Sequence, residues 1–429
     1  MVIEKRKFIT ASRQSIDERF SDSKIGAVYQ KCMENTLDTT IQRDEQGTFI
    51  LTGDIPAMWL RDSVCQIRPF LLFAKELPEL QELIVGLIHR QCLLIQEDPY
   101  ANAFNQQANG QGHQDDDTDM KPIIWERKYE IDSLCYPLQL AYLFWKITGN
   151  TQHFDEEFVE AAKGIVALWQ TEQHHEEDSP YRFERHTDVL TDTLPRAGKG
   201  SPTAYTGMTW SGFRPSDDAC TYGYLIPSNM FAVVVLGYLE EMLEAHYQEA
   251  DFLQAVQTLK REIQQGIERY GTVEHKEFGT IYAFETDGLG NHLLMDDANV
   301  PSLMALPFLG YCSAADPVYQ NTRAFILSSA NPFYYTGRAA NGVGSPHTPP
   351  HHIWPIALSI QGLTSRFEGE KRDIINTLLR TDAGKSLMHE SFHADDPKLY
   401  TREWFSWANM MFCELVLDVA GYRLRAMIE

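Results

Sequence analysis

Two adjacent aspartates, Asp217 and Asp218, are of the residue type that acid–base chemistry needs. If one of them lies against the aromatic side chains of Phe213 and Tyr222, loss of hydration raises its pKa and keeps it protonated at neutral pH, as a general acid requires. The other aspartate can then bind a hydroxyl group. In the alternative interpretation Ser216 caps a helix and both aspartates lie in its first turn, and spacing alone favours this arrangement.

A second segment, His389–His393, matches the pattern H-E-x-x-H. On a helix this spacing holds zinc between two histidines one turn apart, and the glutamate activates water. Glu403 or Glu414 would then be the third ligand. However, Gly384 comes shortly before the motif and Pro397 shortly after it, so a helix there would be very short. This favours a second interpretation, in which the glutamate of the motif is a general base carried on a loop.

A third segment combines an aromatic residue with charged ones. Pro56 should end any earlier helix, so Trp59, Arg61 and Asp62 are expected to project from a turn that precedes an apolar helix. In the alternative interpretation Asp62 caps that helix and Trp59 fills the core.

Two other polar clusters are weak candidates for metal-binding sites. The acidic loop 115–119 lacks the glycine and the bidentate glutamate of an EF-hand loop. His347, His351 and His352 are interrupted by two prolines, and we expect them on a loop that lines a polar cleft. The phosphate-binding loop, the dinucleotide fingerprint and the G-x-S-x-G elbow do not occur in the sequence. We therefore expect no metal and no cofactor.

Helices must position these residues. Apolar residues recur three and four apart over residues 138–146, 158–172, 230–246, 252–270 and 404–427. Strand-like runs are few, the best being 48–52 and 280–284, which we expect as hairpin or rim pieces. The long polar segments 98–118, 187–209 and 336–350 exceed simple connectors and are of the kind that builds sites. About a dozen helices in antiparallel pairs can bury their apolar faces as a double ring, and the lack of a fixed repeat favours closure. The prediction is an all-α toroid forming a single domain over residues 1–429.

Composition excludes several classes of protein. The 37 lysines and arginines face 60 aspartates and glutamates, a net charge of −23, which argues against nucleic-acid binding. No apolar run approaches the roughly 20 residues that cross a bilayer. Residues 1–20 are rich in charge, so we expect no signal peptide and a cytoplasmic location.

A carbohydrate ligand fits these residues best, because sugars combine hydroxyl groups with apolar ring faces. Inverting glycosidases hold a carboxylic acid and a carboxylate base about 6.5–9.5 Å apart, with the attacking water between them. Asp217 or Asp218 and Glu390 are candidates for this pair. A zinc metallopeptidase, a carbohydrate-binding module without turnover and a helical scaffold are the alternatives, and the acids concentrated in loops argue against the scaffold.

The chain closely resembles glycoside hydrolase family 125, the bacterial exo-α-1,6-mannosidases, along essentially its whole length. The resemblance rests on LTGDIPAMWLRDS (51–63), IWERKYEIDSLCYPLQLAY (124–142), TWSGFRPSDDACTYGYLIPSNM (209–230), WPIALSIQGLT (354–364) and MHESFHADDPKLYTREWFSWANMMFCEL (388–415). It implies an (α/α)6 barrel with a few short β-strands in the loops. It also implies metal-independent hydrolysis with inversion, which removes the non-reducing terminal mannose from α-1,6-linked mannosides such as trimmed N-glycan fragments.

The resemblance also implies site residues. It places the general base at Glu390 and the general acid within Arg214–Asp218, where Asp217 is preferred and Asp218 is kept as the alternative. Each further candidate for the mannose pocket has a core or ion-pair role as its alternative. These candidates are Trp59, Arg61, Asp62, Glu126, Glu130, Asp132, Arg214, His389 and Trp404. The sequence makes no prediction of oligomeric state.

Overall fold

Helices form two rings, one inside the other, in the computed structural model, which describes residues 2–428 and the side chains of residues 7–428. Outer and inner helices alternate along the chain. Among the described residues the inner ring consists of α3 (Leu60–Ile67), α6 (Ile131–Thr148), α10 (Ile226–His246), α12 (Leu306–Leu309), α14 (Pro355–Leu363) and α16 (Ser406–Ala420). The outer ring consists of α2 (Ser23–Thr39), α5 (Pro78–Glu97), α7 (Glu156–Gln173), α11 (Ala250–Tyr270), α13 (Pro317–Ile326) and α15 (Glu368–Arg380).

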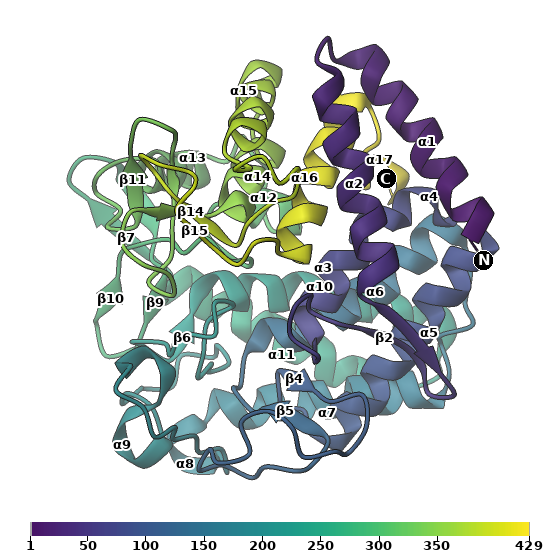
Figure 1. Cartoon of the computed structure of the whole chain (residues 1–429). Coiled ribbons are helices and arrows are strands. Elements are labelled where there is room, and N and C mark those ends of the chain that lie inside the picture. Colours follow the sequence, from purple (N-terminus) through teal and green to yellow (C-terminus); the bar gives the residue numbers. More distant parts are fainter. Residues whose placement is uncertain (1, 429) are drawn as a thin grey trace.

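The first and last helices of the barrel close the ring. In Figure 1 the purple α2 lies beside the yellow α16, and α16 also packs against α3 and α14. The N- and C-terminal ends therefore lie near each other. The remaining helical segments are α1 (Val2–Arg19), α4 (Leu71–Ala74), α8 (His175–Asp178), α9 (Pro195–Gly198), α17 (Arg425–Ile428) and the 3₁₀ turns η1 (Arg68–Phe70) and η2 (Leu190–Asp192). This architecture confirms the predicted (α/α)6 barrel.

The two rings differ in how their helices are buried. The inner helix α16 buries every residue except Asp418 and Ala420. The outer helix α11 buries only a stripe with helical spacing, Val256, Leu259, Ile263 and Gly266–Ile267, and exposes polar residues elsewhere. One hydrophobic cluster extends from Phe8 to Leu424. A single domain over residues 1–429 stays a prediction.

One helix among the described residues, α10, is long and apolar enough to span a membrane by length and composition. However, 67% of its most apolar window is buried inside the protein, where it packs against α6 and α11. Burial on this scale is typical of the core helix of a barrel.

Short antiparallel strands connect the helices. They are β1 (Ile41–Asp44), β2 (Gly47–Ile50), β3 (Met58–Trp59), β4 (Ala103–Phe104), β5 (Ile124–Glu126), β6 (Tyr224–Leu225), β7 (Thr272–His275), β8 (Gly279–Tyr282), β9 (Glu285–Thr286), β10 (His292–Leu293), β11 (Tyr334–Thr336), β12 (Asn341–Val343), β13 (His352–Ile353), β14 (Ser391–His393) and β15 (Tyr400–Thr401). The two predicted strands correspond to β2 and β8, which pair with β1 and β7 in separate hairpins. Several strands end just before an inner helix, as β3 does before α3 and β6 before α10. Because the inner helices run in the same direction, these strands gather at one end of the barrel.

Candidate active site

A cavity of about 280 Å³ lies at the N-terminal ends of the inner helices. This volume is just below the roughly 300–1,000 Å³ of typical small-molecule sites. Its lining comes from segments far apart in the sequence: Thr52, Ile55, Trp59, Arg61, Asp62, Pro215, Ser216, Asp217, Asn299, His347, Trp354, Glu390, Arg402, Phe405 and Trp407. The cavity thus brings together carboxylates, cations and aromatic rings, which is the composition that a sugar pocket needs.

Asp217 reaches this cavity from a tight turn. The backbone N–H of Asp217 donates to the carbonyl of Arg214 (2.9 Å), and the N–H of Arg214 donates to the carbonyl of Asp218 (2.8 Å). Asp217 itself has φ of 68°, in the left-handed region that non-glycine residues rarely adopt. The next helix among the described residues, α10, begins only at Ile226. The interpretation of Ser216 and the two aspartates as a helix N-terminus is therefore wrong.

The two adjacent aspartates point into different surroundings. Asp217 lines the cavity, and its Oδ1 accepts hydrogen bonds from Arg61 Nη2 (3.3 Å) and Asn102 Nδ2 (3.4 Å). Asp218 does not line the cavity; it accepts from Ser216 Oγ (3.1 Å) and lies 3.6 Å from Nδ1 of His347. The left-handed turn thus separates two neighbours that the sequence alone leaves equivalent.

The surroundings of Asp217 are cationic rather than aromatic. Burial raises the pKa of Asp217, but the positive charge of Arg61 and a hydrogen bond from Glu130 outweigh burial. With smaller contributions from the charges of Lys128 and His347, they bring this pKa to about 2. Lys128 lies next to it, with Nζ donating to the carbonyl of Asp217 (2.8 Å). The expectation that Phe213 and Tyr222 raise the pKa of the aspartate in the cavity is therefore wrong for Asp217.

Arg61 is surrounded by a cluster of acids at the wall of the cavity. Among the described residues its guanidinium contacts Asp62 (3.4 Å), Glu130 (2.5 Å), Asp132 (3.2 Å) and Asp217 (3.3 Å). Asp62 lies in the first turn of α3, and Glu130 and Asp132 lie at the start of α6. Burial raises the pKa of Asp62, raises that of Asp132 to about 6, and raises that of Glu130 well above its usual value.

Glu390 enters the cavity just before β14. Strand β14 pairs with β15 so that Ser391 lies opposite Thr401, which places Arg402 next to Glu390, with Nη1 3.6 Å from Oε1. Arg402 also binds Asp54 at the rim. Asp217 and Glu390 therefore line the same cavity from two unrelated segments, each beside its own arginine.

His347 is a further charged group in the cavity. Burial lowers the pKa of His347, but the Asp218 carboxylate, with smaller contributions from Asp217 and Glu390, raises it to about 9. The imidazole is thus protonated at neutral pH. The sequence placed His347, His351 and His352 together on a cleft, and the structure brings only His347 to the cavity lining.

The H-E-x-x-H segment does not form a metal-binding helix. Ser391–His393 are strand β14, in which successive side chains point to opposite faces. The His389 ring stacks on Tyr400, with 3.8 Å between ring centroids, while the His393 ring packs edge-on to His352. In the described residues no group of three or more His, Cys, Asp and Glu side chains is placed to hold a metal ion. The zinc-peptidase alternative lacks the helix on which it depends.

Several predicted pocket residues lie outside the cavity lining and brace the segments that form it. Glu126 accepts from Asn102 Nδ2 (3.0 Å), the amide that also contacts Asp217. Arg214 pairs with Glu285 (2.6 Å) behind the turn. Seven of the predicted site residues lie outside the lining of this cavity, and their contact with sugar stays a prediction: Glu126, Glu130, Asp132, Arg214, Asp218, His389 and Trp404.

Other cavity residues were not singled out from the sequence. Arg402 and Trp407 belong to the family motif 388–415, and Trp354 begins the motif 354–364. Their residue types alone do not show whether they line a cavity or fill the core. Asn299 belongs to no motif. Predicting that these residues line the cavity would have required knowledge of which segments meet at this end of the barrel.

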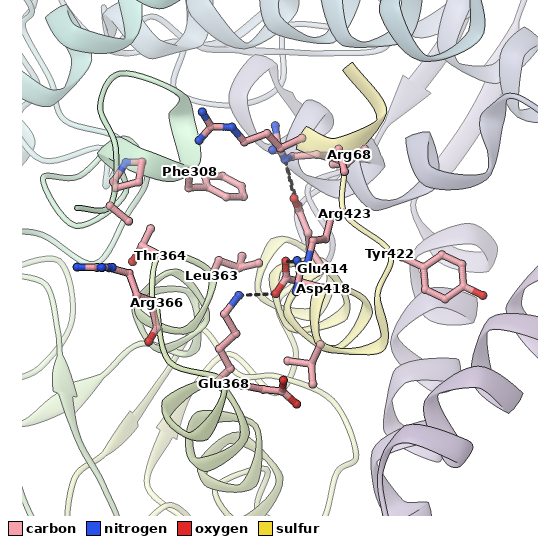
Figure 2. A pocket seen from close by; sticks show the side chains of 18 residues that line it. Arg68, Phe308, Leu363, Thr364, Arg366, Glu368, Glu414, Asp418, Tyr422 and Arg423 are labelled. Carbon is pink, nitrogen blue, oxygen red and sulfur yellow. Dashed lines mark hydrogen bonds and ion pairs between the residues drawn. The ribbon is translucent and has the colours of Figure 1, made fainter. Parts of the chain in front are cut away.

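A larger cavity of about 640 Å³ lies at the opposite end of the barrel, where α14 and α16 end (Figure 2). Its acids are already paired: Glu414 with Arg68 (3.1 Å), and Asp418 with Lys371 (2.5 Å) and Arg423 (3.3 Å). Glu414, a conceivable third zinc ligand, is thus at the wrong end of α16. The smaller cavity is the candidate active site because it brings Asp217 and Glu390 together with aromatic side chains.

A family model and a solved structure both indicate metal-independent α-mannosidases. A model of glycoside hydrolase family 125, described as metal-independent α-mannosidases, matches residues 22–417. A solved Streptococcus pneumoniae structure, described among metal-independent α-mannosidases that process N-linked glycans, is a non-productive complex with α-1,6-mannobiose. It is 55% identical with a TM-score of 0.95, over 97% of this chain and 98% of that one.

Two further relatives are more distant. The meiotically up-regulated gene 157 protein of Schizosaccharomyces pombe is 39% identical, over 96% of this chain and 86% of its own length. A family 78 rhamnosidase of Bacillus sp. GL1 is 12% identical with a TM-score of 0.54, over 92% of this chain and 35% of that one, and it shares the fold alone.

Proposed function

The chain belongs to glycoside hydrolase family 125, the metal-independent α-mannosidases, and on this premise we propose that it is an exo-α-1,6-mannosidase acting with inversion of configuration. Membership confirms the resemblance noted in the sequence motifs. The proposed substrates are α-1,6-linked mannosides, including N-glycan fragments, because a relative 55% identical binds α-1,6-mannobiose. A cytoplasmic location stays a prediction.

The observation that carries the mechanism is that Asp217 and Glu390 line one cavity from different segments. In the proposed reaction Glu390, as carboxylate, removes a proton from water on one face of C1 of the sugar. Asp217, when protonated, donates to the departing glycosidic oxygen on the other side. We place the acid at Asp217 rather than Asp218 because only Asp217 lines the cavity.

The shape of the cavity supports exo action. Aromatic side chains of Trp59, Trp354 and Trp407 offer apolar surfaces for a ring face, and Asn299 and Asp62 offer hydrogen-bonding groups for hydroxyls. Inner helices close the cavity from below, and buried Arg61 forms part of its floor. A pocket of this kind accepts a chain end rather than the middle of a chain.

The test is proton NMR of α-1,6-mannobiose with the enzyme, with and without EDTA, following the anomeric signal of the first mannose released. We expect β-mannose first and no effect of EDTA. The α-1,2- and α-1,3-linked mannobioses are the controls for linkage, and we expect them to react far more slowly. First release of α-mannose would overturn inversion, and loss of activity with EDTA would restore the metal interpretation.

A further inference from the structure

The Arg61 cluster holds more acid than one guanidinium can neutralise. Of the acids around Arg61, the side chains of Asp62, Glu130 and Asp132 are 5% exposed or less, and only Asp217 reaches solvent, with 24% of its side chain exposed. If all four were ionised, the buried cluster would carry a large uncompensated negative charge. Charges out of water repel strongly, so the cluster must keep at least one proton.

The neighbouring cations do not remove this excess. The Lys128 ammonium is bound to Asp192 and lies 3.8 Å from Glu126. His347 faces Asp218, and Arg402 faces Glu390 and Asp54. Lys128 and His347 both keep a raised pKa and stay cationic at neutral pH, so they favour the ionised form of Asp217 without relieving Glu130.

Glu130 is the member best placed to hold the proton. Its side chain is 0% exposed. Its Oε2 accepts from Arg61 Nη1 (2.5 Å) and Ser133 Oγ (2.8 Å), while no N–H or O–H group of the described residues donates to Oε1. Asp62 and Asp132 also have one buried oxygen without a donor among the described residues, so the contact with Asp217 is what distinguishes Glu130. The Glu130 carboxyl is also within hydrogen-bonding reach of the Asp217 carboxylate. A proton on the Glu130 carboxyl would satisfy both groups, because this carboxyl can then donate to the Asp217 carboxylate.

We propose that Glu130 and Asp217 share one proton. Glu130 holds this proton in the resting enzyme and passes it to Asp217 when substrate binds and its glycosidic oxygen reaches Asp217. This rests on the proposed function, in which Asp217 is the general acid. Glu130 acts through Asp217 and is a positioning residue. Burial, followed by the charge of Asp217, raises the pKa of Glu130, which agrees with this assignment.

The proton balance of one turnover closes. Glu130 gives its proton to Asp217, which gives a proton to the glycosidic oxygen as the C1–O bond breaks and its electron pair stays on that oxygen. Glu390 takes a proton from the water whose oxygen bonds to C1. Glu390 then loses that proton to solvent, and the pair regains one from solvent through the exposed carboxylate of Asp217.

The test compares Glu130→Gln with Asp132→Asn, since each variant removes one carboxylate from Arg61 but only Glu130 reaches Asp217. The readout is the pH profile of kcat/KM on α-1,6-mannobiose, whose alkaline limb reports proton loss from the coupled pair. For Glu130→Gln we expect this limb to move to lower pH by about one unit or more, because Asp217 is left alone beside Arg61. For Asp132→Asn we expect a clearly smaller shift.

A second substrate separates proton delivery from structure. The leaving group of 2,4-dinitrophenyl α-mannoside needs no proton, so Glu130→Gln should retain most of the wild-type rate on it while losing activity on mannobiose at neutral pH. A uniform loss on both substrates with an unshifted pH profile would overturn the proposal. If the wild-type enzyme releases no mannose from mannobiose, the proposed function fails instead, which is a distinguishable result.

A spectroscopic measurement on the wild-type protein tests the proposal even if a variant folds poorly. Infrared difference spectra of wild type between pH 7 and alkaline pH should show a protonated carboxyl band that is lost along with activity. Asp296, whose pKa burial raises to about 8, adds a band of its own that should be the same in every variant. The remaining band should persist in Glu130→Asp, which keeps an acid, and disappear in Glu130→Gln. A wild-type protein with no such titrating band would overturn the proposal without any variant.

Discussion

His347 Nδ1 lies 3.6 Å from Asp218 Oδ1, which joins an aspartate outside the cavity to a histidine that lines it. This contact shows that the two adjacent aspartates have different roles. Asp217 faces the cavity and Asp218 holds a protonated imidazole there, so each carboxylate has a separate task. Asp218 therefore influences the reaction only through His347.

The two aspartates should respond differently to the same substitution. Asp217→Asn removes the proton donor, and we expect kcat on α-1,6-mannobiose to fall by about 10²-fold or more. Asp218→Asn removes the partner of His347, so we expect a rise in KM larger than the fall in kcat. Steady-state kinetics on both variants is the measurement. The reverse pattern would move the general acid to Asp218.

Glu390→Gln should separate binding from turnover. The amide keeps the size of the side chain but cannot deprotonate water, so kcat should fall by about 10²-fold or more. Calorimetric titration should show nearly unchanged affinity for α-1,6-mannobiose. Azide, which attacks without losing a proton, should restore part of the activity and give the β-mannosyl azide. A near-normal rate in this variant would remove Glu390 from the mechanism.

His347 should make stability depend on alkaline pH. Its folded-state pKa of about 9 exceeds the usual value of 6.5, so the folded protein binds more protons than the unfolded chain between these values. The stabilisation is complete below pH 6.5 and is lost as pH rises through 9. Urea unfolding at several pH values should show this decrease in the free energy of unfolding. The decrease should be smaller in Asp218→Asn, and an equal decrease would contradict the assignment.

The buried Glu414 of the larger cavity should matter for stability and not for catalysis. Glu414→Ala leaves Arg68 buried without its carboxylate partner, so we expect the free energy of unfolding to fall by about 3–5 kcal/mol. The folded fraction should keep its kcat, because this pair lies at the other end of the barrel. Glu368→Ala, which removes an exposed carboxylate paired with Arg19 and Arg372, is the matched control and should change neither quantity measurably. A specific loss of kcat in Glu414→Ala would contradict this division.

Local patterns predicted part of the helices by residue range, namely α6, α7, α10, α11 and α16. The buried stripe of α11, from Val256 to Ile267, has the spacing of apolar residues that the sequence shows. The turn at Asp217 was not predicted, because Ser216 and two aspartates also fit a helix start, and only the backbone hydrogen bonds with Arg214 decide between the two. The H-E-x-x-H pattern was misleading for a similar reason, since strand pairing of β14 determines where its side chains point.

The sequence by itself determined the helical class, the family and the segments that carry Trp59, Arg61, Asp217 and Glu390, because short-range periodicity and long shared motifs depend on neighbours along the chain. Only the tertiary structure decided that Arg61 lies among acids from α3, α6 and the turn at Asp217. Charge interactions and hydration change over a few ångströms in space. Protonation in this site is therefore a property of the closed ring, which brings together residues far apart in the sequence.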